Sequence, residues 1–291
     1  MSVAALDVTT GHTRQRRRRR LLISVAEHSI AIALAVAFLA PFAIIFLTAF
    51  MTQGQAGTGA LWPRPWVWSN FGDVLQAMPF WRNFGNSVLY AVLACVGVIL
   101  SSVPVAYALA RLRWRAREWV FVIVLATMMV PAQVTSLPLY VMYSNLGWIG
   151  SLAPLIVPTF FGDAYSIFLL RQFFMTIPQE LSEAARIDGS GEFGIMMRVI
   201  VPIAKPGIAA IGLFSFLWAW NDFYNPLLYT GDNNNNQTLA VALSQLAKSA
   251  HEQAQQMQMA AALMFAIPVI VIFFFSQKAF VEGISITGVK G

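Results

Sequence analysis

The stretch IPQELSEAARIDGSGEFGIMMRVIVPIAKP, residues 177–206, decides how this chain folds, because it is a polar, ordered segment between long apolar ones. It predicts a short helix over about 178–188. Pro178 suits a first helical position, Glu180 favours the positive helix end, and Gly189 can close the helix in a left-handed cap. A capped helix of this kind indicates an ordered structural element and not a simple connecting loop.

Long apolar stretches surround this segment. Of the 291 residues, 58% are hydrophobic and 11% are charged, whereas soluble domains carry about 25% charged residues. Crossing the hydrocarbon of a bilayer takes about 20 apolar residues, and the backbone there must satisfy its own hydrogen bonds. We therefore expect an all-α, polytopic membrane helical bundle with six transmembrane helices, at about 29–50, 86–110, 119–142, 152–174, 204–228 and 258–280.

The basic residues predict the orientation of these helices, because Lys and Arg favour the cytoplasmic side of short loops. With six spans, 16 of the 19 basic residues fall on the side of the chain ends. Only Arg64, Arg82 and Lys248 fall on the other side. Both termini are expected in the cytoplasm, and the run RQRRRRR at 14–20 is interpreted as a topology anchor, not as a nucleic-acid arm or a cleaved signal.

Several chemistries are disfavoured by the sequence. Cys95 is the only cysteine, and the three histidines are scattered, so we expect no metal site and no catalytic group. The segment GSGEFG at 189–194 matches a dinucleotide-binding pattern, but it lacks the strand and following helix that such a site needs. The sequence contains no G-x-x-x-x-G-K-[ST] phosphate loop, so ATP would have to bind another polypeptide.

EAARIDG at 183–189, followed by Pro202, resembles the EAA loop of ABC importer permeases. That pattern is EAA, three residues, Gly, nine residues, Ile, one residue, Leu, Pro, and the spacing here matches without a gap. Val199 and Val201 replace the Ile and the Leu conservatively.

Further motifs point within that family to the carbohydrate group, in particular to the MalG-type subunit of maltose transporters. They are NS at 86–87, AYALAR at 106–111, MVPAQVTSLPLY at 129–140, WNDF at 220–223 and GVKG at 288–291. The resemblance implies a basic cytoplasmic tail at 1–28, a first membrane helix at 29–50, an extracytoplasmic loop at 51–85, an ABC importer type I permease core at 86–280 and a cytoplasmic tail at 281–291.

The resemblance also implies roles for residues. A coupling helix in the EAA loop would dock on a separate ATPase subunit, and the C-terminal tail would reach the same ATPases. The coupling residues are Glu183, Ala184, Ala185, Asp188, Gly189 and Pro202, and the tail residues are Val289, Lys290 and Gly291.

The assembly implied in this way is an importer in the bacterial cytoplasmic (inner) membrane. Its other members are a second permease, two ATPase subunits that hold ATP and Mg, and an extracytoplasmic sugar-binding protein. This chain is expected to bind no cofactor, no metal and no nucleic acid, to be no enzyme, and to form half of an alternating-access pathway for sugars or oligosaccharides.

Polar residues inside two apolar stretches are candidates for the sugar pathway. Asp163 lies near the middle of the fourth stretch, and intramembrane carboxylates rarely face lipid. On the fifth stretch, Asn221, Asp222 and Asn225 share one helical side, with Trp220 as a stacking face for a sugar ring. Hydrogen bonding between helices explains both groups equally well.

Two alternatives stay open. An ABC importer permease for glycerol phosphate or amino acids would carry the same EAA loop, although WNDF and GVKG favour carbohydrate. An ATP-independent carrier should instead show a chain of charged groups or paired repeats across the membrane, and it would leave the EAA loop unexplained.

Overall fold

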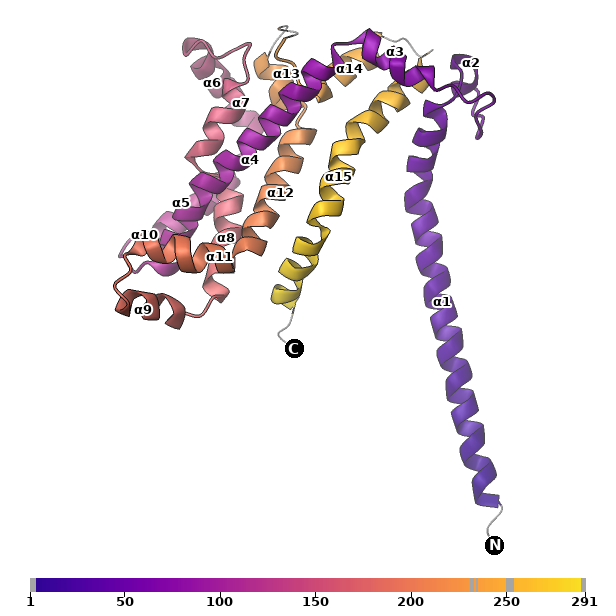
Figure 1. Ribbon diagram of the computed structural model, residues 1–291, viewed down its shortest axis with the longest axis horizontal. Helices are drawn as coiled ribbons and strands as arrows, with labels where there is room; N and C mark the ends of the chain where they lie inside the picture. The colour runs from indigo at the N-terminus through magenta and orange to yellow at the C-terminus, as the bar shows by residue number, and fades with distance from the viewer. Residues whose placement is uncertain (1–3, 231–232, 234, 250–253, 289–291) are drawn as a thin grey trace. The chain divides into compact units, whose positions relative to one another are not determined.

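The computed structural model describes residues 4–230, 233, 235–249 and 254–288, and for 4–22, 249 and 276–288 it describes the backbone alone. Every regular element in this part of the chain is helical (Figure 1). The elements are α1 (Ala4–Ala49), α2 (Gln53–Ala56), α3 (Ser69–Ala77), α4 (Phe80–Arg111), α5 (Arg117–Met128), α6 (Ala132–Asn145), α7 (Ala153–Ile156), η1 (Val157–Phe161), α8 (Ala164–Thr176), α9 (Glu180–Ile187), α10 (Glu192–Ile195), η2 (Met196–Ile200), α11 (Val201–Ile203), α12 (Lys205–Asn221), α13 (Tyr224–Thr230), α14 (Leu239–Ser249) and α15 (Gln255–Gly288).

Four helical segments among the described residues are long and apolar enough to cross a membrane by themselves. They are Ile23–Ala49, Phe80–Arg111, Ala153–Thr176 and Gln255–Phe275. Two helix pairs pass the same test only together, α5 with α6 and Glu192–Ile203 with α12. The predicted six spans are reached if each of these pairs is counted as one.

Both pairs are sharply bent, which the sequence analysis did not anticipate. The bend is 92° between α5 and α6 and 80° before α12. Pro131 stands at the first break and disfavours a helical residue before it. Pro206 lies in the first turn of α12, where proline starts a helix more readily than it continues one.

The predicted span 204–228 is also wrong at its other end. The helix α12 stops at Asn221, and α13 starts again at Tyr224. A continuous helix would bring the ring of Pro226 against the carbonyl of Asp222, four residues earlier. Two further boundaries differ, since α4 begins at Phe80 and not at 86, and helix already begins at Ala4 in the predicted tail 1–28.

The chain divides into two compact units. The first contains residues 1–70 and 252–263, and the second contains 71–251 and 264–291. In the first unit the ring of Phe50 packs against Trp66 and Trp68, with centroids 5.2 and 4.7 Å away. Asn70 closes this turn, because its side-chain amide donates to the carbonyls of Ala49 and Met51 over 2.8 and 2.9 Å.

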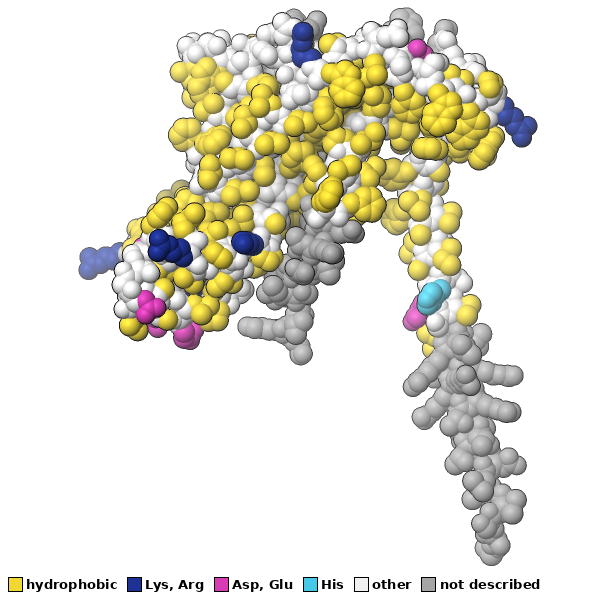
Figure 2. Space-filling view, in the orientation of Figure 1, with side chains coloured by type: hydrophobic (Ala, Val, Ile, Leu, Met, Phe, Trp, Pro, Cys, Tyr) yellow, Lys and Arg dark blue, Asp and Glu magenta, His cyan; other side chains and the backbone are white. Residues whose placement is uncertain are grey.

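In the second unit α4 packs against both α8 and α12. Figure 1 shows α9, α10 and α11 together at one end of these helices and α13 and α14 at the other. Gly97 permits a close approach within this bundle, since a Cβ there would lie 2.8 Å from Cδ2 of Phe160. Acidic and basic side chains gather where α9 and α10 lie, and hydrophobic ones cover much of the bundle between its two ends (Figure 2).

Candidate functional site

The predicted short helix exists as α9, Glu180–Ile187. The sequence had suggested Pro178 as the first helical residue. In the structure Gln179 is the N-cap residue, so Pro178 precedes the helix. Glu180 and Glu183 lie in the first turn and Arg186 in the last. This charge order complements the helix dipole, with carboxylates at the positive end and a cation at the negative end.

Gly189 ends α9 in the predicted left-handed conformation, with φ +83°. The amide of Ser190 donates to the carbonyl of Ala185 over 2.9 Å, and the amide of Gly189 donates to Arg186 over 3.1 Å. These two bonds form a Schellman cap, which satisfies carbonyls at the helix end. The end of α9 is therefore firmly defined.

One face of α9 packs inward and the other is open. Ser182 is buried, and Ala185 packs against the hydrophobic core formed by α4, α8 and the 195–211 segment. Glu183, Ala184 and Asp188 are exposed. Leu181 and Ile187 are also outward, with 42% and 87% of their surface exposed. The open face thus combines two carboxylates with apolar and small side chains.

Arg111, the last residue of α4, ties α9 to the bundle. Its guanidinium donates to the carbonyls of Ile177 and Pro178 over 2.7 and 2.9 Å. It also donates to Oγ of Ser182 over 2.8 Å. The side chain of Arg111 therefore donates hydrogen bonds both to the backbone that leads into α9 and to a side chain on the buried face of α9.

A second link runs through Glu192 of α10. Its carboxylate accepts from the hydroxyl of Tyr107 over 2.7 Å and from the guanidinium of Arg186 over 2.6 Å. Tyr107 belongs to α4 and Arg186 to α9, so the carboxylate joins three helices. The hydrogen bond from Arg186 to Glu192 raises the pKa of this guanidinium, because it stabilises the charged form.

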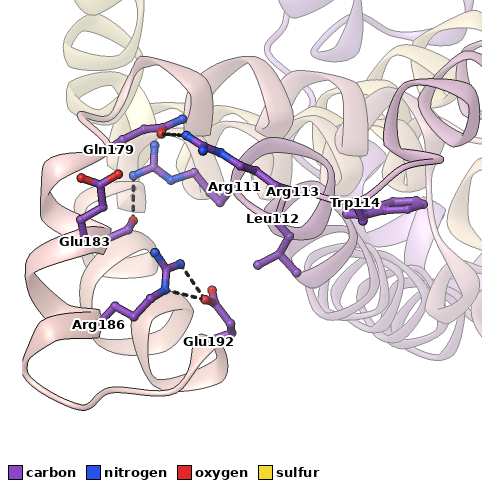
Figure 3. A pocket seen from close by; sticks show the side chains of 9 residues that line it. Arg111, Leu112, Arg113, Trp114, Gln179, Glu183, Arg186 and Glu192 are labelled. Atoms are coloured by element: carbon purple, nitrogen blue, oxygen red, sulfur yellow. Dashed lines mark hydrogen bonds and ion pairs between the residues drawn. The ribbon is translucent and has the colours of Figure 1, made fainter.

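A cavity of about 570 Å³ lies between the end of α4 and α9. Figure 3 shows Arg111 and Arg113 directed toward Gln179 from one side, with the pair of Arg186 and Glu192 on the other. Its lining residues are Arg111, Leu112, Arg113, Trp114, Gln179, Ser182, Glu183, Arg186 and Glu192.

The rest of the EAA pattern belongs to the core. Ile195 and Ile200 are completely buried, and Val199 and Val201, at the two apolar positions of the pattern, pack against the same cluster. Pro202 lies in α11 with an exposed side chain. The spacing of the motif therefore reflects the folding of 192–204 back onto α4 and α8.

Sequence reasoning missed two basic residues that do more than set orientation. Arg111 and Arg171 were both counted as cytoplasmic basic residues, and Arg111 also ends the AYALAR motif, but no contact was predicted for either. Arg171 is buried, lies 3.9 Å from the ring centre of Phe121, and pairs with Glu118 over 3.2 Å. The sequence does not show the partners of these two residues, because their contacts are with segments distant in the chain.

Asp163 is the N-cap residue of α8, and its carboxylate accepts from the amide of Ser166 over 2.8 Å. Gly162, with φ +110°, separates this cap from η1. The fourth predicted span is therefore interrupted at the position of the carboxylate. The cap explains why an aspartate is tolerated there, and it leaves the second carboxylate oxygen available.

The polar residues of the fifth stretch do not share one helical side. Asp222 accepts from the hydroxyl of Tyr90 over 2.9 Å and from the side chain of Asn225 over 3.0 Å, across the break between α12 and α13. Asn221 is exposed and donates to Leu217. Trp220 is 1% exposed and donates to the carbonyl of Phe265 over 3.2 Å.

The motif residues Asn86 and Ser87 lie inside α4 and hold the distant α14. Oγ of Ser87 accepts from the amide of Leu239, the first residue of α14, over 2.8 Å. The side chain of Asn86 donates to the carbonyls of Asn235 and Gln237 over 2.8 and 2.9 Å. Ser87 therefore caps the start of α14, and Asn86 holds the segment that leads into it.

The expected tail residues Val289, Lys290 and Gly291 lie outside the described residues. Within the described part of the chain, no group of three or more His, Cys, Asp or Glu side chains is arranged to hold a metal ion. Cys95 lies in α4, half-buried and unpaired there.

Comparison with known proteins shows which family the chain resembles. The family described as "Binding-protein-dependent transport system inner membrane component" matches residues 102–286. The arabinooligosaccharides transport system permease protein AraQ of Halalkalibacterium halodurans is 32% identical over 216 residues, covering 74% of this chain and 76% of that protein. The sn-glycerol-3-phosphate transport system permease protein UgpE of Yersinia pestis is 31% identical over 265 residues, covering 88% and 94%.

The fold also has a solved counterpart. A chain from the crystal structure of a bacterial ABC transporter involved in the import of the acidic polysaccharide alginate aligns with a TM-score of 0.78. That chain is 26% identical, and the alignment covers 90% of this chain and 97% of the other.

Proposed function

Because the chain belongs to the family of binding-protein-dependent transport system inner membrane components, we propose that it forms half of the membrane pathway of an ATP-driven importer. It is a permease subunit of an ABC transporter and not itself an enzyme. Its proposed partners are a second permease, two ATPase subunits that bind ATP and Mg, and an extracytoplasmic binding protein. Both termini and the loop 177–206 lie in the cytoplasm in this proposal.

The observation that carries the proposal is α9, a capped helix with one anchored and one open face. In the proposed assembly it is the coupling helix, and Glu183, Ala184 and Asp188 face the ATPase. Carboxylates can pair with basic groups of a partner, and Ala permits close approach. Ala185 packs α9 against the core, and Gly189 ends the helix. Pro202 and the tail residues 289–291 are assigned a contact with the ATPase by resemblance alone.

The two links to α4 supply the mechanical part of the mechanism. When ATP closes the ATPase pair, a displaced α9 pulls on Arg111 directly and on Tyr107 through Glu192. Because both residues belong to α4, the displacement reaches the helix at the centre of the bundle. The conformational equilibrium then shifts by the difference in contact free energy between the two states of the importer.

We propose sugars or oligosaccharides as the cargo. The named cargo of the AraQ relative and of the alginate transporter supports this class. Asp163, Asn221, Asp222 and Asn225 remain candidates for the pathway, whereas Trp220 is left out because its ring is covered. The UgpE relative favours a second candidate, a phosphorylated small solute such as sn-glycerol 3-phosphate.

The test is uptake by the importer assembled from this chain and its proposed partners, the ATPase, the second permease and the binding protein. Glu183→Ala should lower uptake about tenfold or more, because a charge-assisted contact with the ATPase is lost. Membrane insertion should persist, since α9 lies outside the spans. Asp73→Ala removes an exposed carboxylate of α3 and is the matched control. Normal uptake in the Glu183 variant would reject the coupling role.

A further inference from the structure

A second cavity of about 570 Å³ lies in the bundle, away from α9. Its walls come from α4, from the η1 and α8 segment, and from α12. The side chains that matter here are Thr159, Asp163, Tyr165, Phe214, Ser215 and Trp218. The cavity therefore opens where the fourth span is interrupted, beside the Asp163 cap.

The charged lining of this cavity is acidic and has no basic partner among the described lining residues. Among the described residues that line it, Asp163 is the one charged side chain, and no Lys or Arg stands near enough to share the lining. A phosphate or carboxylate ligand usually meets Arg, Lys or several backbone amides in its site. A carboxylate without a cation instead repels an anion.

The cavity offers unused hydrogen-bonding groups. One oxygen of Asp163 accepts from Ser166, and the other makes no hydrogen bond to any described residue. The same holds, within the described chain, for the hydroxyls of Tyr165 and Ser215, which carry one donor each. An acceptor and two hydroxyls around one space suit the hydroxyl groups of a polyol.

Aromatic rings provide the remaining wall. Trp218 is 60% exposed and Tyr165 is 45% exposed, although both line the cavity. The rings of Tyr165 and Phe214 lie 6.5 Å apart at 68°, an edge-to-face arrangement that holds both in place. Trp218 precedes the buried Trp220 by two residues, so the two indoles point to different sides of α12.

We propose that this cavity is a subsite for an uncharged sugar ring, with Trp218 as the stacking face and Asp163 as the acceptor for hydroxyls. The inference rests on the proposed import function and narrows its cargo. A neutral oligosaccharide fits the lining, whereas a phosphorylated solute or an acidic polysaccharide meets an unbalanced carboxylate. Apolar rings with a few convergent polar groups are the usual composition of a ligand site.

The direct test is thermal unfolding of the purified importer with millimolar arabinotriose or maltotriose as neutral probes. Alginate trisaccharide and glycerol 3-phosphate serve as acidic probes. At least one neutral sugar should raise the midpoint by about 2 °C or more. Trp218→Ala should abolish the shift. Trp119→Ala, which removes a 75% exposed indole of α5 outside the cavity, should keep it.

The contrary results are equally specific. No shift with either neutral sugar, an equal shift in the Trp218 variant, or a shift with the acidic probes alone would overturn the subsite.

Asp163→Asn separates charge from structure, because asparagine caps a helix as well as aspartate does. The variant should fold normally. The ratio of its affinities for neutral and acidic probes should fall by about tenfold. An unchanged preference would count against the charge argument.

The two proposals fail in different ways. If the wild-type importer takes up no solute when its partners are present, the proposed function fails. If it takes up a sugar and Trp218→Ala takes up the same sugar with an unchanged KM, only the subsite fails.

Discussion

Nη2 of Arg111 lies 2.8 Å from Oγ of Ser182, and this bond joins the end of α4 to the buried face of α9. The two residues are 71 positions apart in the chain. The position of α9 therefore depends on α4 as well as on the loop that contains α9.

Replacing Arg111 with Gln should loosen α9 without unfolding the bundle. Hydrogen bonds from a charged donor contribute about 1.5–3 kcal/mol each, so amide exchange over 180–187 should rise at least tenfold. Hydrogen exchange with mass spectrometry measures this directly. Arg113→Gln is the control, because the hydrogen bond from its guanidinium to Gln179 is long, at 3.4 Å. Equal protection in both variants would mean that Arg111 does not hold α9.

Substitutions at Gly189 should weaken coupling in a graded way. Alanine at a positive φ costs about 1–2 kcal/mol, and proline can neither adopt this φ nor donate to Arg186. We expect lower uptake in Gly189→Ala and much lower uptake in Gly189→Pro, with assembly retained. Gly191→Ala is the control, because Gly191 has φ −70° and no atom within 4 Å of a Cβ. Normal uptake in Gly189→Pro would contradict the role of the cap.

Two glycines of α4 should respond oppositely to the same change. Gly97→Ala places a Cβ 2.8 Å from Phe160, and overpacking of this kind costs about 1–3 kcal/mol. At Gly85 nothing lies within 4 Å, so alanine should stabilise the helix by about 0.5–1 kcal/mol. Thermal unfolding in detergent compares the two, and a stabilised Gly97 variant would show that the contact yields easily.

Ser87→Ala should release the start of α14. The hydroxyl caps the amide of Leu239, and loss of a cap costs about 1 kcal/mol. Faster exchange at 239–242 with an unchanged α9 is the expected pattern. Ser136→Ala removes only a hydrogen bond within its own helix and should change neither region. Equal exchange in the two variants would show that the cap contributes little.

The parts of this molecule that could be predicted are those with local signals. Glu180 and Gly189 act within one helix, so its ends followed from the sequence to within two residues. Apolar length likewise indicated several helices that are long and apolar enough to cross a membrane. The bend before α6 was missed because an apolar stretch over 119–142 looks continuous in the sequence. The bend before α12 was missed because the segment 192–203 was assigned to the loop and not to a membrane-spanning pair.

Contacts between distant segments were beyond such reasoning. Trp220 and Trp218 look alike in the sequence, yet one is buried against Phe265 and the other lines a cavity. Asn86 and Ser87 were identified as a motif of the family, while their partners lie about 150 residues away. In each case the packing of two helices decides the role, and no local pattern records it.

The links from α4 to α9 and α10 also limit how such permeases can exchange parts. A chimera that received only residues 177–206 from a relative would carry a foreign Ser182 and Glu192 against the native Arg111 and Tyr107. The recombining unit must therefore include the end of α4. Segments 107–111 and 177–206 are distant in the sequence, but a working chimera should exchange them together.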